Sequence, residues 1–395
     1  MSNNRLIDTK ITLRNTSKIG ITARTMSIYL IITTCGLYAL PNSLTNLIKP
    51  LFIYILLLET IILRKKLYFK IESWISLCFA LYLFLIFLKT GINSSNFINL
   101  APLLLNLLLF FLATLNEYNK KEIELLLNSL YWAGFIFSFI VAISNPIIGN
   151  DISRINIYYL NNSLNANGIP YLIVPSIVIG TKKLFNSHAN VVNRIIVIFT
   201  LFVMLYTIFY TSTRGAILAL LISLFLLVFK YILRNIKDRR ILAVLLLSIF
   251  VFFCSIVVLY LLPEKIVNRA FNFSSYSLNS RDQLWRLAIS LSKNNICFGN
   301  GFDYWAEVTG SPYGAHNLFL DLLVSSGILG SLMMILLVSI IVLKSKNVLL
   351  LSLLTAPIMN SLFEAGRTYD FWNPLILCVL IYSSTYYKSS EVVRS

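Results

Sequence analysis

Apolar runs recur along the whole of this chain, and each is about as long as the ~20-residue helix that spans the ~30 Å hydrocarbon core of a bilayer. Hydrophobic residues make up 57% of the 395 residues and charged residues only 12%, whereas a soluble domain carries about 25% charged residues. Within lipid, helices and closed barrels satisfy all backbone hydrogen bonds, and the alternating short strands of a barrel are absent. We therefore predict an all-α, polytopic integral membrane protein.

About twelve membrane-spanning helices are expected from these runs. Lys and Arg gather in the short segments between alternate runs, and positive charge in such segments marks the cytoplasmic side of a membrane. An even number of spans with both termini cytoplasmic fits this pattern. The predicted spans are 26–40, 45–63, 74–89, 99–115, 125–148, 168–180, 192–210, 213–233, 241–262, 314–343, 347–362 and 371–387.

The spans form one membrane domain with short polar ends. We predict a basic cytoplasmic segment at 1–25, a single transmembrane domain at 26–387 and a cytoplasmic tail at 388–395. A long external loop at 263–313 separates the ninth span from the tenth. The first apolar run lacks a small-residue cleavage site, so we interpret it as a retained span.

The formal net charge of +17 does not predict a nucleic-acid-binding protein, because its cations lie in the short loops that set membrane topology. The partner expected from this distribution is the lipid bilayer. The chain has five cysteines without a C-x-x-C pair, and only two histidines, His188 and His316. We therefore expect no disulfide framework, no metal site and no bound cofactor.

The external loop contains its own helix signal. Ser280-Arg281-Asp282-Gln283 has the spacing of a capping box. The residues that follow form an apolar stripe at helical spacing, which predicts an amphipathic helix lying on the outer membrane surface. The stripe consists of Leu284, Trp285, Leu287, Ala288 and Leu291.

His316 is the only histidine on the predicted external side, and it lies where the polar loop turns into the tenth span. Imidazole titrates near neutrality, so His316 is a candidate general base for a hydroxyl group. The alternative is a capping or satisfied interfacial histidine. Asn317 is a neighbouring candidate for substrate binding, and Asp321 shares its helix face one turn deeper.

Arg214 begins the eighth span on the external side, directly after Thr211-Ser212-Thr213. It is either an arginine that extends to the interface or a functional charge at the edge of the hydrocarbon. Guanidinium groups and helix N-termini both favour phosphate. Arg214 and Arg281 are therefore candidate ligands of a phosphate or diphosphate group, although Arg281 taken alone also fits an exposed loop arginine.

The remaining candidate substrate contacts also lie in predicted external segments. Tyr304 and Trp305 suit sugar binding because aromatic rings stack on C–H faces, although aromatic residues also anchor at membrane interfaces. Glu364 and Arg367 either pair with each other or line a cavity, and Arg154 is a candidate contact in the segment 149–167.

Four motifs in order along residues 205–345 resemble those of the bacterial O-antigen ligase and O-antigen polymerase superfamily, whose members are polysaccharide-assembling membrane glycosyltransferases. The chain has an extra Thr where the family has S-R-G-A, which puts the role of the serine in doubt. The matching stretches are Ser212-Thr213-Arg214-Gly215-Ala216, Arg281 with Trp285, Gly299-Asn300-Gly301, and Ala315-His316-Asn317 with Gly327 and Gly330.

The resemblance implies a GT-C-like helical membrane fold and metal-independent transfer on the periplasmic or external face of the bacterial inner (plasma) membrane. It also implies a polyprenyl-diphosphate-linked oligosaccharide as donor. Arg214 and Arg281 would then hold the donor diphosphate, and His316 would help to deprotonate the acceptor hydroxyl. A chain-length regulator is a candidate partner.

The sequence leaves the reaction open between several alternatives. The run from His316 to Gly330 favours a polymerase of O-antigen or capsule repeat units. A ligase that transfers the glycan to lipid A-core is the first alternative. A transporter or flippase of the same lipid-linked sugars is the second, and a membrane subunit without activity is the third.

Overall fold

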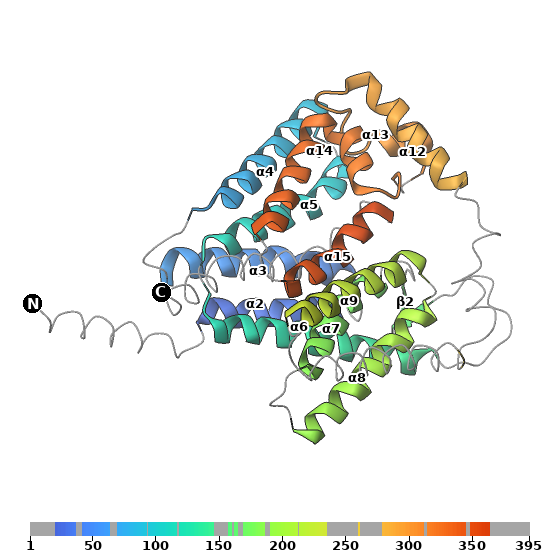
Figure 1. Cartoon of the computed structure of the whole chain (residues 1–395). Coiled ribbons are helices and arrows are strands. Elements are labelled where there is room, and N and C mark those ends of the chain that lie inside the picture. Colours follow the sequence, from blue (N-terminus) through green and yellow to red (C-terminus); the bar gives the residue numbers. More distant parts are fainter. Residues whose placement is uncertain are drawn as a thin grey trace, which may run out of the picture.

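The structure is a computed structural model of the whole chain, and it describes residues 20–36, 42–63, 69–92, 94–116, 118–145, 157–159, 162–164, 169–185, 190–211, 213–234, 260, 279–311, 314–344 and 348–363. Helices dominate these residues (Figure 1). The first half contains α2 (Ile21–Ile31), the π-helical η1 (Ile32–Gly36), α3 (Asn42–Leu63), α4 (Ile71–Thr90), α5 (Ser94–Thr114), α6 (Lys120–Ser144) and α7 (Ile169–Leu184). The second half contains α8 (Val191–Tyr210), α9 (Arg214–Arg234), α12 (Asn279–Ser292), η3 (Lys293–Asn295), α13 (Tyr304–Thr309), α14 (Leu318–Lys344) and α15 (Val348–Phe363).

Most of the predicted spans coincide with these helices. Within the described part of the chain, five helices are long and apolar enough to cross a membrane, namely α4, α5, α6, α8 and α14. Shorter apolar helices follow the predicted spans in α3, α9 and α15. The expectation of a largely helical membrane protein is therefore confirmed. The predicted spans 241–262 and 371–387 lie outside the described residues, apart from residue 260.

Polar side chains define where the apolar helices begin. Asn119 caps α6 by accepting a hydrogen bond from the Glu122 backbone N–H at 3.0 Å, and the Glu122 carboxylate accepts the Asn119 N–H at 2.7 Å. This is the reciprocal arrangement of a capping box. The same carboxylate accepts the Gly20 N–H at 2.7 Å, so one acidic residue joins the beginnings of α2 and α6.

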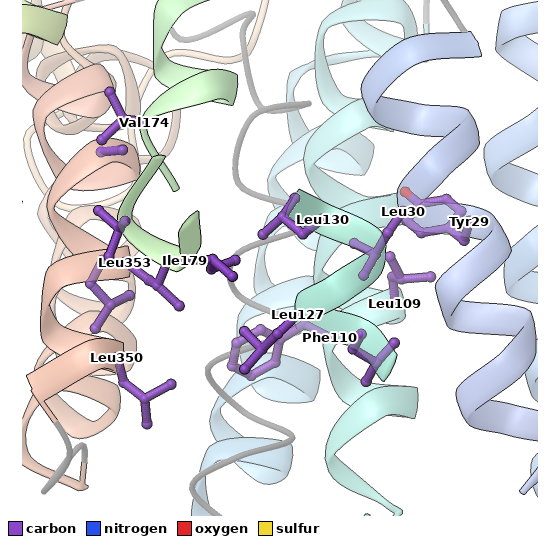
Figure 2. Packing of buried hydrophobic residues seen from close by; sticks show 14 of the residues in the cluster. Tyr29, Leu30, Leu109, Phe110, Leu127, Leu130, Val174, Ile179, Leu350 and Leu353 are labelled. Carbon is purple, nitrogen blue, oxygen red and sulfur yellow. The ribbon is translucent and has the colours of Figure 1, made fainter. Parts of the chain in front are cut away.

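Helix α7 lies at the centre of the bundle, and residues 171–181 are all buried. It packs against α6, α8, α9 and α15. Close packing with α6 depends on Gly134, because a Cβ there would lie 2.1 Å from Ser176 Oγ. Ser176 Oγ donates a hydrogen bond to the Leu130 carbonyl at 2.8 Å. Figure 2 shows the apolar core running from Tyr29 and Leu30 in α2, past α5, α6 and α7, to Leu350 and Leu353 in α15.

A small antiparallel hairpin departs from the all-α expectation. β1 (Ile157–Tyr159) pairs with β2 (Asn162–Leu164) within the predicted external segment 149–167. The Tyr159 ring is only 1% exposed and stacks on Phe137 of α6, with ring centroids 4.9 Å apart. The hairpin therefore packs onto the C-terminal half of α6, a contact that the polar local composition does not encode.

Helix α14 is broken at Gly327, whose φ of 70° and ψ of −170° are not helical. The break leaves backbone groups of the helix without their usual intrahelical partners, and other segments supply them. The backbone N–H groups of Asn300 and Gly301 donate to the carbonyls of Val324 and Ser325 at 2.9 and 3.0 Å.

A helix of the bundle and the segment after α12 supply further partners at this break. Tyr82 of α4 donates its hydroxyl to the Ser326 carbonyl at 2.6 Å. The Ile328 N–H donates to the Ile296 carbonyl at 2.8 Å. The break thus joins residues 296–301 to the bundle.

Candidate functional site

Helix α12 forms the predicted amphipathic element, but its apolar stripe faces protein. Ala288 and Leu291 are buried in a cluster with Trp305 of α13, Ala315 and Val324. Leu284, Trp285 and Leu287 pack against the same cluster. The expectation that this helix lies with its stripe on the outer membrane surface is therefore wrong. Figure 1 shows α12 and α13 together at one end of α14.

The polar loop between α12 and α14 is also fixed to the bundle. The Asp303 N–H donates to Asn96 Oδ1 at 2.7 Å, and Asn99 Nδ2 donates to the Phe302 carbonyl at 3.2 Å. Both asparagines belong to the first turns of α5. A Cβ at Gly301 would lie 2.8 Å from Thr90 at the end of α4. The loop therefore covers the junction of α4 and α5, which makes it a rigid support for the residues that follow it.

Arg281 and Trp285 lie one turn apart on α12, as the R-x-x-x-W spacing predicts. Trp285 donates its indole Nε1–H to the Ala315 carbonyl at 3.1 Å. This bond joins α12 to the residue directly before His316. The Arg281 guanidinium lies close enough to His316 to lower the pKa of the imidazole. The structure thus brings together two of the candidate catalytic residues, which are 35 positions apart in the chain.

His316 has an unusual backbone and a partly desolvated side chain. Its φ of 54° makes it the one non-glycine residue with positive φ in the described part of the chain, a conformation that is uncommon and that clusters at functional sites. Nδ1 is buried and has no hydrogen-bond partner among the described residues. Burial, and then the Arg281 guanidinium, hold the pKa of His316 below its ordinary value of 6.5. Both causes favour the neutral imidazole, the form that can accept a proton.

Asn317 caps α14. Its Oδ1 accepts the backbone N–H groups of Phe319 and Leu320 at 3.0 and 3.1 Å. Its Nδ2 donates to the Leu362 carbonyl at the end of α15 at 3.3 Å. The first free N–H groups of α14 are therefore partly satisfied from within the protein, which leaves less of this N-terminus for a phosphate group. A contact between Asn317 and substrate stays a prediction.

Asp321 reaches back from the first turn of α14 to the loop. Its Oδ1 accepts the Ala315 backbone N–H at 2.6 Å. The approach is so close that a Cβ on Gly314 would lie 2.2 Å from the same oxygen. Sequence spacing placed Asp321 one turn below Asn317 on the same face, but it did not reveal that the carboxylate points back toward the loop before His316.

Arg214 begins α9 and is half-buried. Helix α9 runs antiparallel to α15: the hydroxyl groups of Ser223 and Thr355 make contact, and Met359 packs against Ala216 and Ala219. If the two helices keep this alignment for one more turn, the first turn of α9 lies beside Leu362 of α15. The Leu362 carbonyl accepts a hydrogen bond from Asn317 Nδ2. The beginnings of α9 and α14 therefore lie at the same end of the bundle.

The other candidate substrate residues have different surroundings. Tyr304 accepts a hydrogen bond at its hydroxyl from Asn294 Nδ2 at 2.7 Å. Trp305 is 8% exposed and belongs to the cluster beneath α12, where its Nε1 is buried without a hydrogen-bond partner among the described residues. Arg154, Glu364 and Arg367 lie outside the described residues.

Three contributors to this site were not predicted from the sequence in their structural roles. They are the indole N–H of Trp285, the carboxylate of Asp321 and the hydroxyl of Tyr82 at the α14 break. The R-x-x-x-W spacing contained a signal for Trp285. Nothing local signals Tyr82, because a tyrosine within an apolar span is ordinary.

The assembled end of the bundle combines two kinds of chemistry. The Arg281 guanidinium supplies positive charge near the His316 imidazole, and burial together with this charge lowers the pKa of His316, which favours its neutral form. Such a pair can bind an anionic group while a neighbouring hydroxyl loses its proton.

Comparison with known proteins gives a family match over part of the chain. A family model described as O-antigen ligase matches residues 199–335. A search of curated proteins found no match. The matched segment contains Arg214, Arg281, the Gly299-Asn300-Gly301 loop, His316 and the α14 break. The resemblance to the O-antigen ligase and polymerase superfamily is therefore confirmed over residues 199–335, the stretch that carries all of its motifs.

Proposed function

We propose that this protein is a membrane glycosyltransferase that uses a polyprenyl-diphosphate-linked oligosaccharide as donor and polymerises O-antigen or capsule repeat units on the external face of the inner membrane. The observation that carries the proposal is the hydrogen bond from Trp285 to the Ala315 carbonyl, which joins the helix of Arg281 to the residue before His316 at the N-terminus of α14. Arg281 lowers the pKa of the imidazole, as expected for a nearby charge. The matching family segment supports glycan assembly as the general function.

In the proposed reaction, His316 acts on the acceptor. Because Nδ1 is buried, Nε2 is the nitrogen that meets the acceptor hydroxyl and takes its proton. The acceptor oxygen forms a new bond to the anomeric carbon of the donor sugar. The bond between that carbon and the diphosphate oxygen breaks, and its electron pair leaves with the polyprenyl diphosphate.

Arg214 and Arg281 act on the donor. Negative charge grows on the diphosphate as the glycosidic bond breaks, and fixed guanidinium groups stabilise charge that develops in the transition state. The same charge near His316 disfavours protonation of the imidazole before substrate binds. Bound diphosphate offsets that effect, so proton transfer to His316 becomes favourable in the complex with donor.

The membrane arrangement belongs to the same proposal. We place about twelve spans in a GT-C-like domain at 26–387, with both termini cytoplasmic and the loop 263–313 external. The joining of the loop to the α4–α5 junction, and of α14 to the end of α15, supports a single external end. Arg154, Tyr304, Glu364 and Arg367 remain candidate contacts for the sugar chain, and a chain-length regulator remains a candidate partner.

One observation favours a second candidate function, transport of the lipid-linked sugar. Transporters often bind substrate at discontinuous helices, and α14 is discontinuous at Gly327. The carbonyls at this break, however, accept hydrogen bonds from Asn300, Gly301 and Tyr82. This arrangement suits a structural joint better than a substrate site.

Purified protein reconstituted in lipid vesicles and supplied with lipid-linked repeat units tests the proposal. A ladder of chain lengths is expected. Transfer of glycan to lipid A-core would indicate the ligase instead, and movement of substrate across vesicles without a new glycosidic bond would indicate the transporter.

Two variants and a matched control assign the residues in the same assay. His316→Ala and Arg214→Ala should each abolish the product while the protein remains in the membrane. Arg286→Ala is the matched arginine control, because Arg286 lies on α12 in an exposed ion pair with Asp282 at 3.0 Å. It should retain activity. Product at the wild-type rate from either of the first two variants would remove that residue from the mechanism.

A further inference from the structure

We propose that Asp321 and Trp285 are positioning residues that hold the Ala315 backbone from both sides and so place His316 for catalysis. The inference rests on the proposed function for its catalytic consequence. We call the two hydrogen bonds to the Ala315 backbone the clamp. Its presence can be measured without catalytic turnover.

The two bonds act on opposite ends of one residue. Asp321 Oδ1 accepts the Ala315 N–H at 2.6 Å, and the Ala315 carbonyl accepts the Trp285 indole N–H at 3.1 Å. Asp321 belongs to α14 and Trp285 to α12, so the residue before His316 is fixed between two helices. The Ala315 side chain is fully buried in the cluster beneath α12, so apolar packing also holds this residue.

The clamp explains how His316 keeps an unfavourable backbone conformation. A non-glycine residue with φ of 54° persists only when its surroundings determine it. On the far side of His316, Asn317 caps α14 and is tied to the end of α15. With both neighbours fixed, the His316 backbone is constrained at each end, and this holds the imidazole near Arg281, whose charge lowers the pKa of His316.

Gly314 provides independent support, because it makes room for the carboxylate. A Cβ at this position would lie 2.2 Å from Asp321 Oδ1 and 2.7 Å from Cγ. Contacts under 3.0 Å do not occur for real Cβ atoms, so a side chain here must displace the carboxylate. The glycine, the carboxylate and the tryptophan thus form one unit although they come from three separate segments.

Conservative variants distinguish positioning from direct chemistry. An asparagine at 321 keeps an oxygen that can accept the Ala315 N–H, whereas an alanine does not. We expect Asp321→Asn to retain at least about a third of the wild-type kcat, and Asp321→Ala to lose about 100-fold, the scale of a misplaced catalytic group. If Asp321 instead carried a proton, Asp321→Asn would lose activity as fully as Asp321→Ala, which would overturn the assignment.

Trp285→Phe tests the other side of the clamp. It keeps an aromatic ring in the cluster but removes the N–H donor, and a fall in kcat of about fivefold is expected for the loss of one hydrogen bond. The KM for the lipid-linked donor should stay unchanged in Asp321→Ala and Trp285→Phe, because Arg214 and Arg281 are intact in both variants. A raised KM with unchanged kcat would assign Asp321 and Trp285 to substrate binding instead.

Hydrogen exchange measures the clamp in the full-length protein without substrate. In peptides covering residues 311–320, the amide protons should exchange faster in Asp321→Ala and Gly314→Ala than in the wild type, with Asp321→Asn close to the wild type. Asp282→Asn is the matched carboxylate control, because Asp282 pairs with Arg286 on the surface of α12.

Hydrogen exchange tests the clamp, and glycan transfer tests the proposed function, so the failure of one can be distinguished from the failure of the other. Unchanged exchange in Asp321→Ala would overturn the clamp whatever the activity. Faster exchange in a protein whose wild type transfers no glycan would leave the clamp in place and overturn the proposed function.

Discussion

Substitution of Gly327 by alanine should destabilise the protein and disable it, because no other residue fits the break in α14. Its φ of 70° and ψ of −170° lie in a region that is essentially restricted to glycine. Strain of this kind costs about 1–3 kcal/mol. A Cβ would also lie 2.4 Å from the Cys297 carbonyl oxygen and 2.6 Å from the Gly299 nitrogen. Since both are backbone atoms, no side-chain rotation relieves the contact.

Relief of that contact requires the loop at 296–301 to move away from α14. The movement would break the bonds from the Asn300 and Gly301 N–H groups to the carbonyls of α14. Each net hydrogen bond contributes about 1 kcal/mol. Together with the backbone strain, we expect a loss of about 3–5 kcal/mol in the free energy of unfolding. The loop carries α13 and leads to His316, so glycan transfer should fall with it.

Gly310→Ala is the matched control for Gly327→Ala. Gly310 ends α13 with a φ of 66°, yet a Cβ there would meet nothing within 4 Å. Only the left-handed backbone penalty of about 1–2 kcal/mol remains. Unfolding by SDS in mixed micelles, followed by tryptophan fluorescence, compares the two variants with the wild type. Equal losses from both would show that the contact with Cys297 does not matter and would refute the reasoning.

Three further predictions concern the chemistry of the site. The kcat/KM for the donor, which reports the free enzyme, should rise with pH through a limb below 6.5, because burial and Arg281 lower the pKa of His316 and the base must be neutral. In Arg281→Gln the residual kcat/KM should show that limb at higher pH, and a limb that does not move would show that the Arg281 charge does not act on His316. Arg281→Lys keeps the charge but loses the bidentate guanidinium, so kcat/KM for the donor should fall by about tenfold or more if the arginine holds diphosphate; kinetics equal to wild type would exclude that role. Transfer should persist in excess EDTA, since arginines supply the positive charge, and loss of activity that is restored by added Mg²⁺ would contradict the proposal.

The apolar runs predicted the membrane-spanning helices well, because a helix that crosses a bilayer needs about 20 consecutive, mostly apolar residues. Helix α12 followed from the stripe at Leu284, Leu287 and Leu291, and α14 from its apolar run. The apolar stripe of α12 does not itself indicate which surface it packs against. A lipid surface and a protein cluster both require apolar side chains, so the sequence alone predicted the wrong neighbour for α12.

The candidate site shows the same division between local and long-range information. The types of residue at 214, 281 and 316 indicated phosphate binding and base catalysis without any structure. Their arrangement depends on contacts between distant segments, such as Trp285 with Ala315 and Asn317 with Leu362. The break in α14 was not predicted either, because a glycine within an apolar helix is common. Only the backbone angles at Gly327 show that the helix is interrupted there.

Arg214 and Arg281 should bind the diphosphate of one donor, while His316 activates the acceptor that attacks that donor. The most direct test is an experimental structure of the full chain with a polyprenyl-diphosphate-linked sugar bound. We expect the diphosphate within hydrogen-bonding reach of both guanidinium groups, with the His316 imidazole facing the anomeric carbon from the side away from the diphosphate. A diphosphate bound elsewhere in the bundle, or one of the two arginines turned away from it, would refute the proposed donor site.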